Sequence, residues 1–163
     1  MSLGTMKRTK PRSLGAQVDR MRGRWPGFSY RMTADGFAMW RGVVQPYQVQ
    51  YEIGLFWVPS SSLKPWVWLI DPGLVPRPGC TYEQIPHLLF YDEKPELSGL
   101  CLFDPDGAEW TNRDLIADTT IPWAAEWLQH YEFWHFDGIW RGKSIGPESV
   151  AEIRASTVHR SAG

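Results

Sequence analysis

The sequence predicts an α+β fold: an N-terminal helix, a four-stranded antiparallel meander, a proline-rich flap and a long second helix. Three observations lead to this prediction. Apolar residues recur at helical spacing in two separate segments, and alternating apolar residues with turn signals fill the region after the first of them. Five prolines and three glycines within residues 71–100 then prevent any long regular element there.

The first helix is predicted to begin after Ser13, whose hydroxyl suits an N-cap. A proline–glycine pair at residues 26–27 ends it. One helical face carries the apolar residues Leu14, Val18, Met21 and Trp25.

Four strands are predicted next, at residues 28–32, 37–44, 47–53 and 65–70. Gly36 supplies the turn between the first two. The third shows the clearest period of two, because Gln48, Gln50 and Glu52 alternate with apolar residues. These apolar residues are Tyr47, Val49, Tyr51 and Ile53. Short connections between successive strands predict an antiparallel meander.

The segment 71–100 is predicted to be an ordered flap, since residues 88–91 (Leu-Leu-Phe-Tyr) provide apolar anchors in an otherwise irregular stretch. The second helix is expected to start at a cap formed by Thr119 or Thr120, to carry Pro122 in its first turn and to end at Gly138. An aromatic stripe predicted to face the core consists of Trp123, Trp127, Tyr131 and Trp134.

These elements define one domain over residues 13–142. Residues 143–163 are expected to form a short tail, with one helical segment at 147–155 and a disordered end. Residues 1–12 are expected to be disordered or, at their start, a cloning remnant.

Composition excludes several classes of protein. The net charge of −1 argues against a nucleic-acid partner, because phosphate binding favours a dense basic face. No apolar run approaches the ~20 residues that cross a bilayer, and no apolar stretch follows the basic N-terminus, so a cytoplasmic protein without a membrane partner is expected. Two cysteines and four histidines show no ligand spacing, and no nucleotide-binding motif is present, so neither a metal nor a cofactor is expected.

Cys101 is the main candidate for chemistry, because a thiolate is a strong nucleophile near neutral pH and Asp104, Asp106 and Asn112 follow it closely. The alternative is a small core residue between two leucines. His87 is a candidate base or orienting group for this cysteine, or a structural histidine bonded to the flap backbone.

The order of these features resembles that of the ubiquitin-conjugating enzymes. The resemblance spans residues 13–142 and is closest to the bacterial members encoded in antiphage operons that signal with cyclic oligonucleotides. Matching segments are Trp40 to Gly42, Pro86-His87, Gly99 to Leu102, Glu109 to Asn112, Thr120 to Trp123, Trp127-Leu128, Tyr131-Glu132, Trp134 and Gly138 to Trp140.

The resemblance implies that the long helix is the family's crossover helix and that Cys101 is the thioester-forming cysteine. His87 matches the flap histidine. The flap asparagine that stabilises the oxyanion during lysine attack has no counterpart, because Leu88 and Leu89 stand there. Asn112, or backbone N–H groups near Cys101, would have to supply that donor.

The function implied is a transferase that forms a cysteine thioester with the C-terminal glycine of a partner, the operon's nucleotide cyclase. A separate activating enzyme would adenylate that glycine. One alternative is a non-catalytic domain of the same fold that binds a ubiquitin-like protein or a partner's tail. Another is a ligand-binding domain with an aromatic face, unrelated to conjugation.

Overall fold

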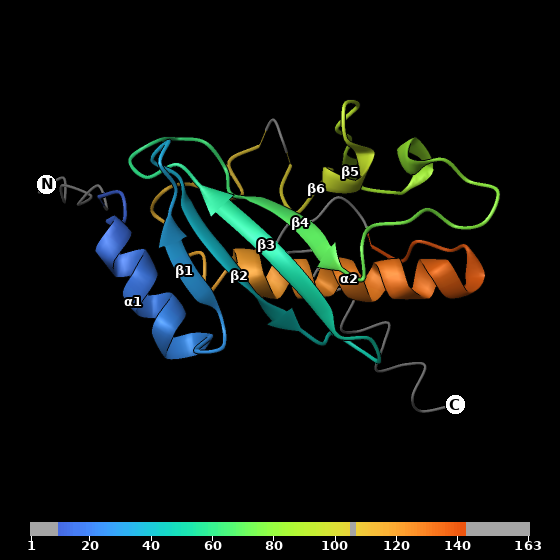
Figure 1. The fold of residues 1–163 in the computed structure, drawn as a ribbon, viewed down its shortest axis with the longest axis horizontal. Helices are drawn as coiled ribbons and strands as arrows, with labels where there is room; N and C mark the ends of the chain where they lie inside the picture. The colour runs from blue at the N-terminus through green and yellow to red at the C-terminus, as the bar shows by residue number, and fades with distance from the viewer. Residues whose placement is uncertain (1–9, 105–106, 143–163) are drawn as a thin grey trace, which may run out of the picture.

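The computed structural model describes residues 10–104 and 107–142, and it confirms the α+β architecture (Figure 1). Four strands form one antiparallel sheet in the order β1-β2-β3-β4, as a meander requires. The main elements are α1 (Leu14–Arg24), β1 (Ser29–Met32), β2 (Ala38–Val44), β3 (Tyr51–Trp57), β4 (Trp66–Asp71) and α2 (Thr120–Asp137). The predicted tail 143–163, with its helix at 147–155, lies outside the described residues, as do residues 1–9.

The ends of the helices follow the sequence signals, with one exception. Ser13 caps α1, since its side-chain oxygen accepts a hydrogen bond from the Ala16 N–H at 3.1 Å. Gly138 ends α2 in the left-handed conformation at φ 77°. Thr119 occupies the predicted N-cap position of α2, but its hydroxyl does not cap the helix and donates to the Leu115 carbonyl at 2.8 Å instead.

The third strand begins and ends later than its alternation predicts, at Tyr51–Trp57 rather than 47–53. The residues before it are attached to α2 instead of the sheet. Tyr47 packs against Phe133 with ring centroids 5.1 Å apart, and the Gln48 N–H donates to a Glu132 carboxylate oxygen at 3.2 Å. The apolar residue at Tyr47 therefore reflects a contact with the helix, while the strand continues through Gly54 and Leu55.

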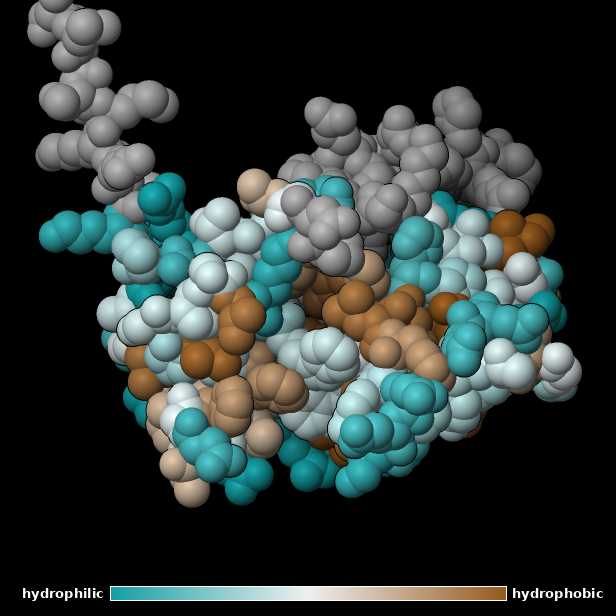
Figure 2. All heavy atoms as spheres, turned by 90° about the horizontal axis from the view of Figure 1, so that it is seen from above, coloured by the Kyte–Doolittle hydropathy of each residue, from teal (hydrophilic) through white to brown (hydrophobic). Residues whose placement is uncertain are grey.

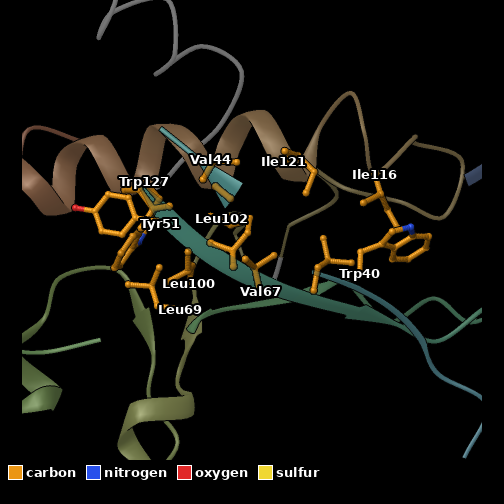
Figure 3. Close-up of a cluster of buried hydrophobic side chains, with 14 of the residues drawn as sticks. Trp40, Val44, Tyr51, Val67, Leu69, Leu100, Leu102, Ile116, Ile121 and Trp127 are labelled. Atoms are coloured by element: carbon orange, nitrogen blue, oxygen red, sulfur yellow. The ribbon is translucent and has the colours of Figure 1, made fainter. Parts of the chain in front are cut away.

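The core lies between one face of the sheet and α2 (Figure 3). Alternate residues of β2, β3 and β4 point into it, and α2 contributes Trp127, Tyr131 and Trp134, all at most 5% exposed. Trp123 is partly buried against the same core. The predicted aromatic stripe is thus mainly a core-facing surface, as an amphipathic helix requires.

The flap after β4 is ordered, and the expected anchors are confirmed only in part, since Leu88 packs against the core while other anchors lie elsewhere in the segment. Leu74, Ile85 and Leu100 are buried apolar residues of the segment 71–100, whereas Phe90 and Tyr91 are exposed. Two short strands, β5 (Leu88–Leu89) and β6 (Gly99–Leu100), pair antiparallel within it. At the base of the flap, the Tyr131 hydroxyl of α2 accepts from the Val75 N–H at 3.1 Å and donates to the Val75 carbonyl at 3.0 Å.

β6 lies against the side chain of Trp66 in β4. A Cβ atom added at Gly99 would come within 2.7 Å of the Trp66 ring, so only glycine allows this close approach. The ring therefore sets how closely the flap strand approaches the main sheet.

α1 is fastened to the segment that precedes α2. The fully buried Gln17 side chain donates to the Asp114 carbonyl and accepts from the Ile116 N–H, both at 2.9 Å. The Trp25 indole N–H donates to the Ala117 carbonyl at 2.8 Å. Polar contacts at the two ends of α1 therefore fix its position relative to the second half of the chain.

Candidate functional site

Cys101 follows β6 directly, and the flap holds its backbone. The Cys101 N–H donates to the His87 carbonyl at 3.0 Å. This bond extends the ladder in which Leu88 pairs with Leu100 and Leu89 with Gly99. The structure thus brings two of the predicted site residues together, and it does so through main-chain atoms.

His87 adopts a left-handed backbone conformation, with φ at 51°. Its carbonyl accepts a second hydrogen bond, from the Trp127 indole N–H at 2.8 Å. Its ring packs against Trp140 with centroids 5.6 Å apart and is hydrogen-bonded to the backbone of Gly142. Burial lowers the pKa of His87, and the Gly142 bond partly opposes this. Among the described residues, the His87 ring is hydrogen-bonded to Gly142. Within those same ranges, no hydrogen bond joins the ring to the Cys101 thiol, whose partner is the Phe103 carbonyl.

The Cys101 thiol is half-buried, and its Sγ donates to the Phe103 carbonyl at 3.5 Å. Burial raises the pKa of Cys101, and the nearby carboxylates of Asp104 and Glu109 raise it further, while Lys64 lowers it. At rest the thiol form is therefore favoured. Cys80 is also half-buried, so exposure alone does not separate the two cysteines.

Lys64 was not among the residues that the sequence marks as functional. It lies in the turn between β3 and β4, and its ammonium donates to the carbonyls of Asp104 and, at 2.9 Å, Gly107. The Asp104 N–H in turn donates to a Glu109 carboxylate oxygen at 2.9 Å. Only the tertiary fold brings this turn to the loop after Cys101, so no sequence spacing could have revealed it.

Asn112 takes part in a different set of contacts. Its side-chain amide donates to the Ser61 carbonyl at 3.2 Å, and its backbone carbonyl accepts from the Arg12 N–H at 2.8 Å. These bonds tie the β3–β4 turn and the chain before α1 to residue 112. The Cys101 N–H is also engaged, by His87, so it does not point to an oxyanion in this arrangement.

A groove of about 310 Å³ runs beside Cys101, and both neighbours of the cysteine line it. Figure 2 shows apolar side chains gathered around a hollow on the face seen from above Figure 1. The groove is lined mainly by apolar side chains, with Lys64 and Ser62 as the polar members. The lining residues are Ser62, Leu63, Lys64, Pro65, Trp66, Leu89, Leu100, Leu102 and Phe103.

Within residues 10–104 and 107–142, no three side chains of the metal-ligating types are grouped closely enough to hold an ion. Neither helix in these ranges combines the length and apolar character needed to span a bilayer.

Comparison with known proteins identifies one family. The family described as type II CBASS E2 protein matches residues 17–147. The match includes most of α1, the whole sheet, the flap with Cys101, and α2. No curated protein matches the chain.

Proposed function

Because the chain belongs to the type II CBASS E2 family, which is ubiquitin-conjugating-like and acts in bacterial antiphage defence, we propose that Cys101 forms a thioester with a partner protein. The donor is the C-terminal glycine of the operon's nucleotide cyclase, and both proteins act in the cytoplasm. The observation that carries this proposal is a half-exposed cysteine, held by the flap backbone, at the margin of an open apolar groove.

The groove suits an extended chain end. Apolar side chains from β4, β5 and the residues around Cys101 line it, and they would bury apolar residues that precede a terminal glycine. Lys64 lies at the same place and favours the negative charge of a thiolate. Both features would help to hold a carbonyl carbon near Cys101.

The proposed reaction has two steps. The Cys101 sulfur attacks the carbonyl carbon of the activated glycine, an S–C bond forms, and AMP leaves with its electron pair while the thiol proton passes to solvent. An activating enzyme that uses ATP supplies the acyl adenylate. In the second step an amine attacks the thioester carbon, a C–N bond forms, the S–C bond breaks with the sulfur leaving as a thiolate, and the nitrogen loses a proton to solvent.

A second candidate is a non-catalytic member of the same fold that binds the partner's tail. One observation favours it: burial and the carboxylates of Asp104 and Glu109 keep the Cys101 pKa above its ordinary value. Leu88 and Leu89 also occupy the place of the family's flap asparagine. In this alternative the groove binds the tail and Cys101 contributes only packing.

Mass spectrometry distinguishes the two candidates. The protein is incubated with its operon's cyclase, the encoded activating enzyme and ATP, then analysed with and without a thiol reductant. We expect a reductant-sensitive adduct with the native protein and with Cys80→Ala, and none with Cys101→Ala. A stable complex without any covalent adduct would instead support the binding alternative.

A further inference from the structure

We propose that Trp127 and Trp140 are positioning residues for Cys101 and act through His87. This inference rests on the proposed function, because it assigns the groups that hold the thioester-forming cysteine in place.

The His87 carbonyl is a shared acceptor. It receives the Trp127 indole N–H at 2.8 Å and the Cys101 N–H at 3.0 Å. Trp127 is fully buried in the core side of α2, so its indole is a fixed point. The chain of bonds therefore runs from the helix through one carbonyl to the backbone of the cysteine.

The ring of His87 is held separately. It packs against Trp140 at 5.6 Å between centroids and is hydrogen-bonded to the Gly142 backbone, in the segment that follows α2. Trp140 also packs edge-on against Trp127 at 5.1 Å. Two indoles in mutual contact thus hold His87 from both its backbone and its side chain.

These contacts explain the unusual backbone of His87. A residue other than glycine at φ 51° needs surrounding structure to hold it there. Without the Trp127 donor, the carbonyl is free to rotate away, and the Cys101 N–H loses its acceptor. The His87 carbonyl accordingly holds the backbone N–H of Cys101, while the His87 ring attaches the flap to Trp140 and Gly142.

The test compares Trp127→Phe with Trp25→Phe. Each variant keeps an aromatic ring and removes one indole-to-carbonyl bond of 2.8 Å, but Trp25 bonds Ala117, outside the site. Thermal unfolding of both checks that the structural cost is similar. The readouts are the pH profile of Cys101 alkylation by iodoacetamide, in a Cys80→Ala background, and the rate of cyclase adduct formation.

For Trp127→Phe we expect the alkylation profile to move to lower pH, because a loosened Cys101 is less buried. Adduct formation should fall roughly tenfold or more, since small displacements of reacting groups are costly. Trp25→Phe should leave both readouts at the native values. Equal behaviour of the two variants in both readouts would overturn the proposal.

If Trp127→Phe does not fold, Trp140→Ala removes the second indole from a partly exposed position. The same two changes are expected, and native values in both readouts would again overturn the proposal. The two readouts also distinguish failure of this inference from failure of the proposed function. If the native protein forms no adduct, the proposed function fails, yet the alkylation profiles still decide whether the indoles position Cys101.

Discussion

At the scale of single residues, Cys101 combines two opposing features. Its backbone is held by the flap and its two sequence neighbours line an open groove, but burial and two carboxylates favour the neutral thiol. Since the thioester formation that we propose uses the thiolate, the local charges control how much of the reactive form exists at a given pH. The carboxylate of Glu109 is the one whose charge can be removed with least disturbance.

Glu109→Gln should lower the Cys101 pKa, because it removes a negative charge while an amide oxygen can still accept from the Asp104 N–H. Alkylation of Cys101 at pH 7.5 should become roughly threefold faster, because a lower pKa leaves a larger fraction of the thiol ionised at that pH. The rate is measured by mass spectrometry in a Cys80→Ala background.

The control for this charge change is Asp19→Asn, on the exposed side of α1, which should leave the rate unaltered. In both proteins the rate should rise with pH, because the thiolate fraction increases as the pH passes through the pKa of Cys101. A Glu109→Gln protein no faster than Asp19→Asn would show that this carboxylate does not control the thiol.

At the scale of elements, β5 and β6 hold the cysteine although each contains only two residues. Their position depends on contact with the main sheet, where the Trp66 ring lies against Gly99. A pair of such short strands has little stability of its own, so this packing decides whether the flap keeps its register.

Gly99→Ala should therefore destabilise the protein by about 1–3 kcal/mol, because the new methyl group would lie 2.7 Å from the Trp66 ring. Gly23→Ala is the matched control: nothing lies within 4 Å of its added Cβ in α1, so it should stabilise the protein by about 0.5–1 kcal/mol. Urea unfolding measures both. A neutral Gly99→Ala would mean that the flap shifts without cost.

The sequence predicts the elements that have long periodic patterns. α1, α2 and the sheet order follow from helical spacing, alternation and turns, and Ser13 and Gly138 mark two helix ends correctly. Alternation could not distinguish the strand from its lead-in at Tyr47, because packing on Phe133 also uses apolar side chains. Strands of two residues show no periodicity at all.

In the candidate site, the residue types could likewise be predicted from the sequence, but the contacts between them could not. Cys101 and His87 are recognisable by residue type and order, and the structure places them next to each other. The bond from Trp127 to the His87 carbonyl is not predictable, since it depends on the left-handed backbone of His87 and on the path of the flap. The position of Lys64 beside the cysteine likewise requires the tertiary fold.

At the scale of the whole molecule, the buried ring of His130 in α2 affects stability. His130 is 3% exposed, and both its ring nitrogens lack a hydrogen-bond partner among the described residues. Burial, with smaller effects of His87 and Arg141, lowers its pKa to about 4. The folded protein therefore holds this ring neutral in conditions where an unfolded chain would protonate it.

Lowering the pH should consequently destabilise the fold. Above pH 6.5 the ring is neutral in both states, and as pH falls toward 4 the unfolded state gains a proton that the folded state excludes. The loss should approach about 3 kcal/mol by pH 4. Urea unfolding at pH 7 and pH 4.5 measures it.

His130→Phe tests whether this histidine is responsible. The variant should lose less stability between pH 7 and pH 4.5 than the native protein, because the aromatic ring remains and the titrating group is gone. His87 and His135, whose pKa values are also lowered, account for a remaining slope of the same sign. An unchanged slope would assign the acid sensitivity to groups other than His130.

The two hydrogen bonds between the Tyr131 hydroxyl and the Val75 backbone attach the start of the flap to α2. Val75 belongs to no helix or strand, yet both its backbone groups are bound to α2, and the next turn of that helix binds His87 through Trp127. Both ends of the segment 75–87 are thus hydrogen-bonded to the same helix. A displacement of α2 should therefore shift both ends of this segment and, through the His87 carbonyl, the backbone of Cys101.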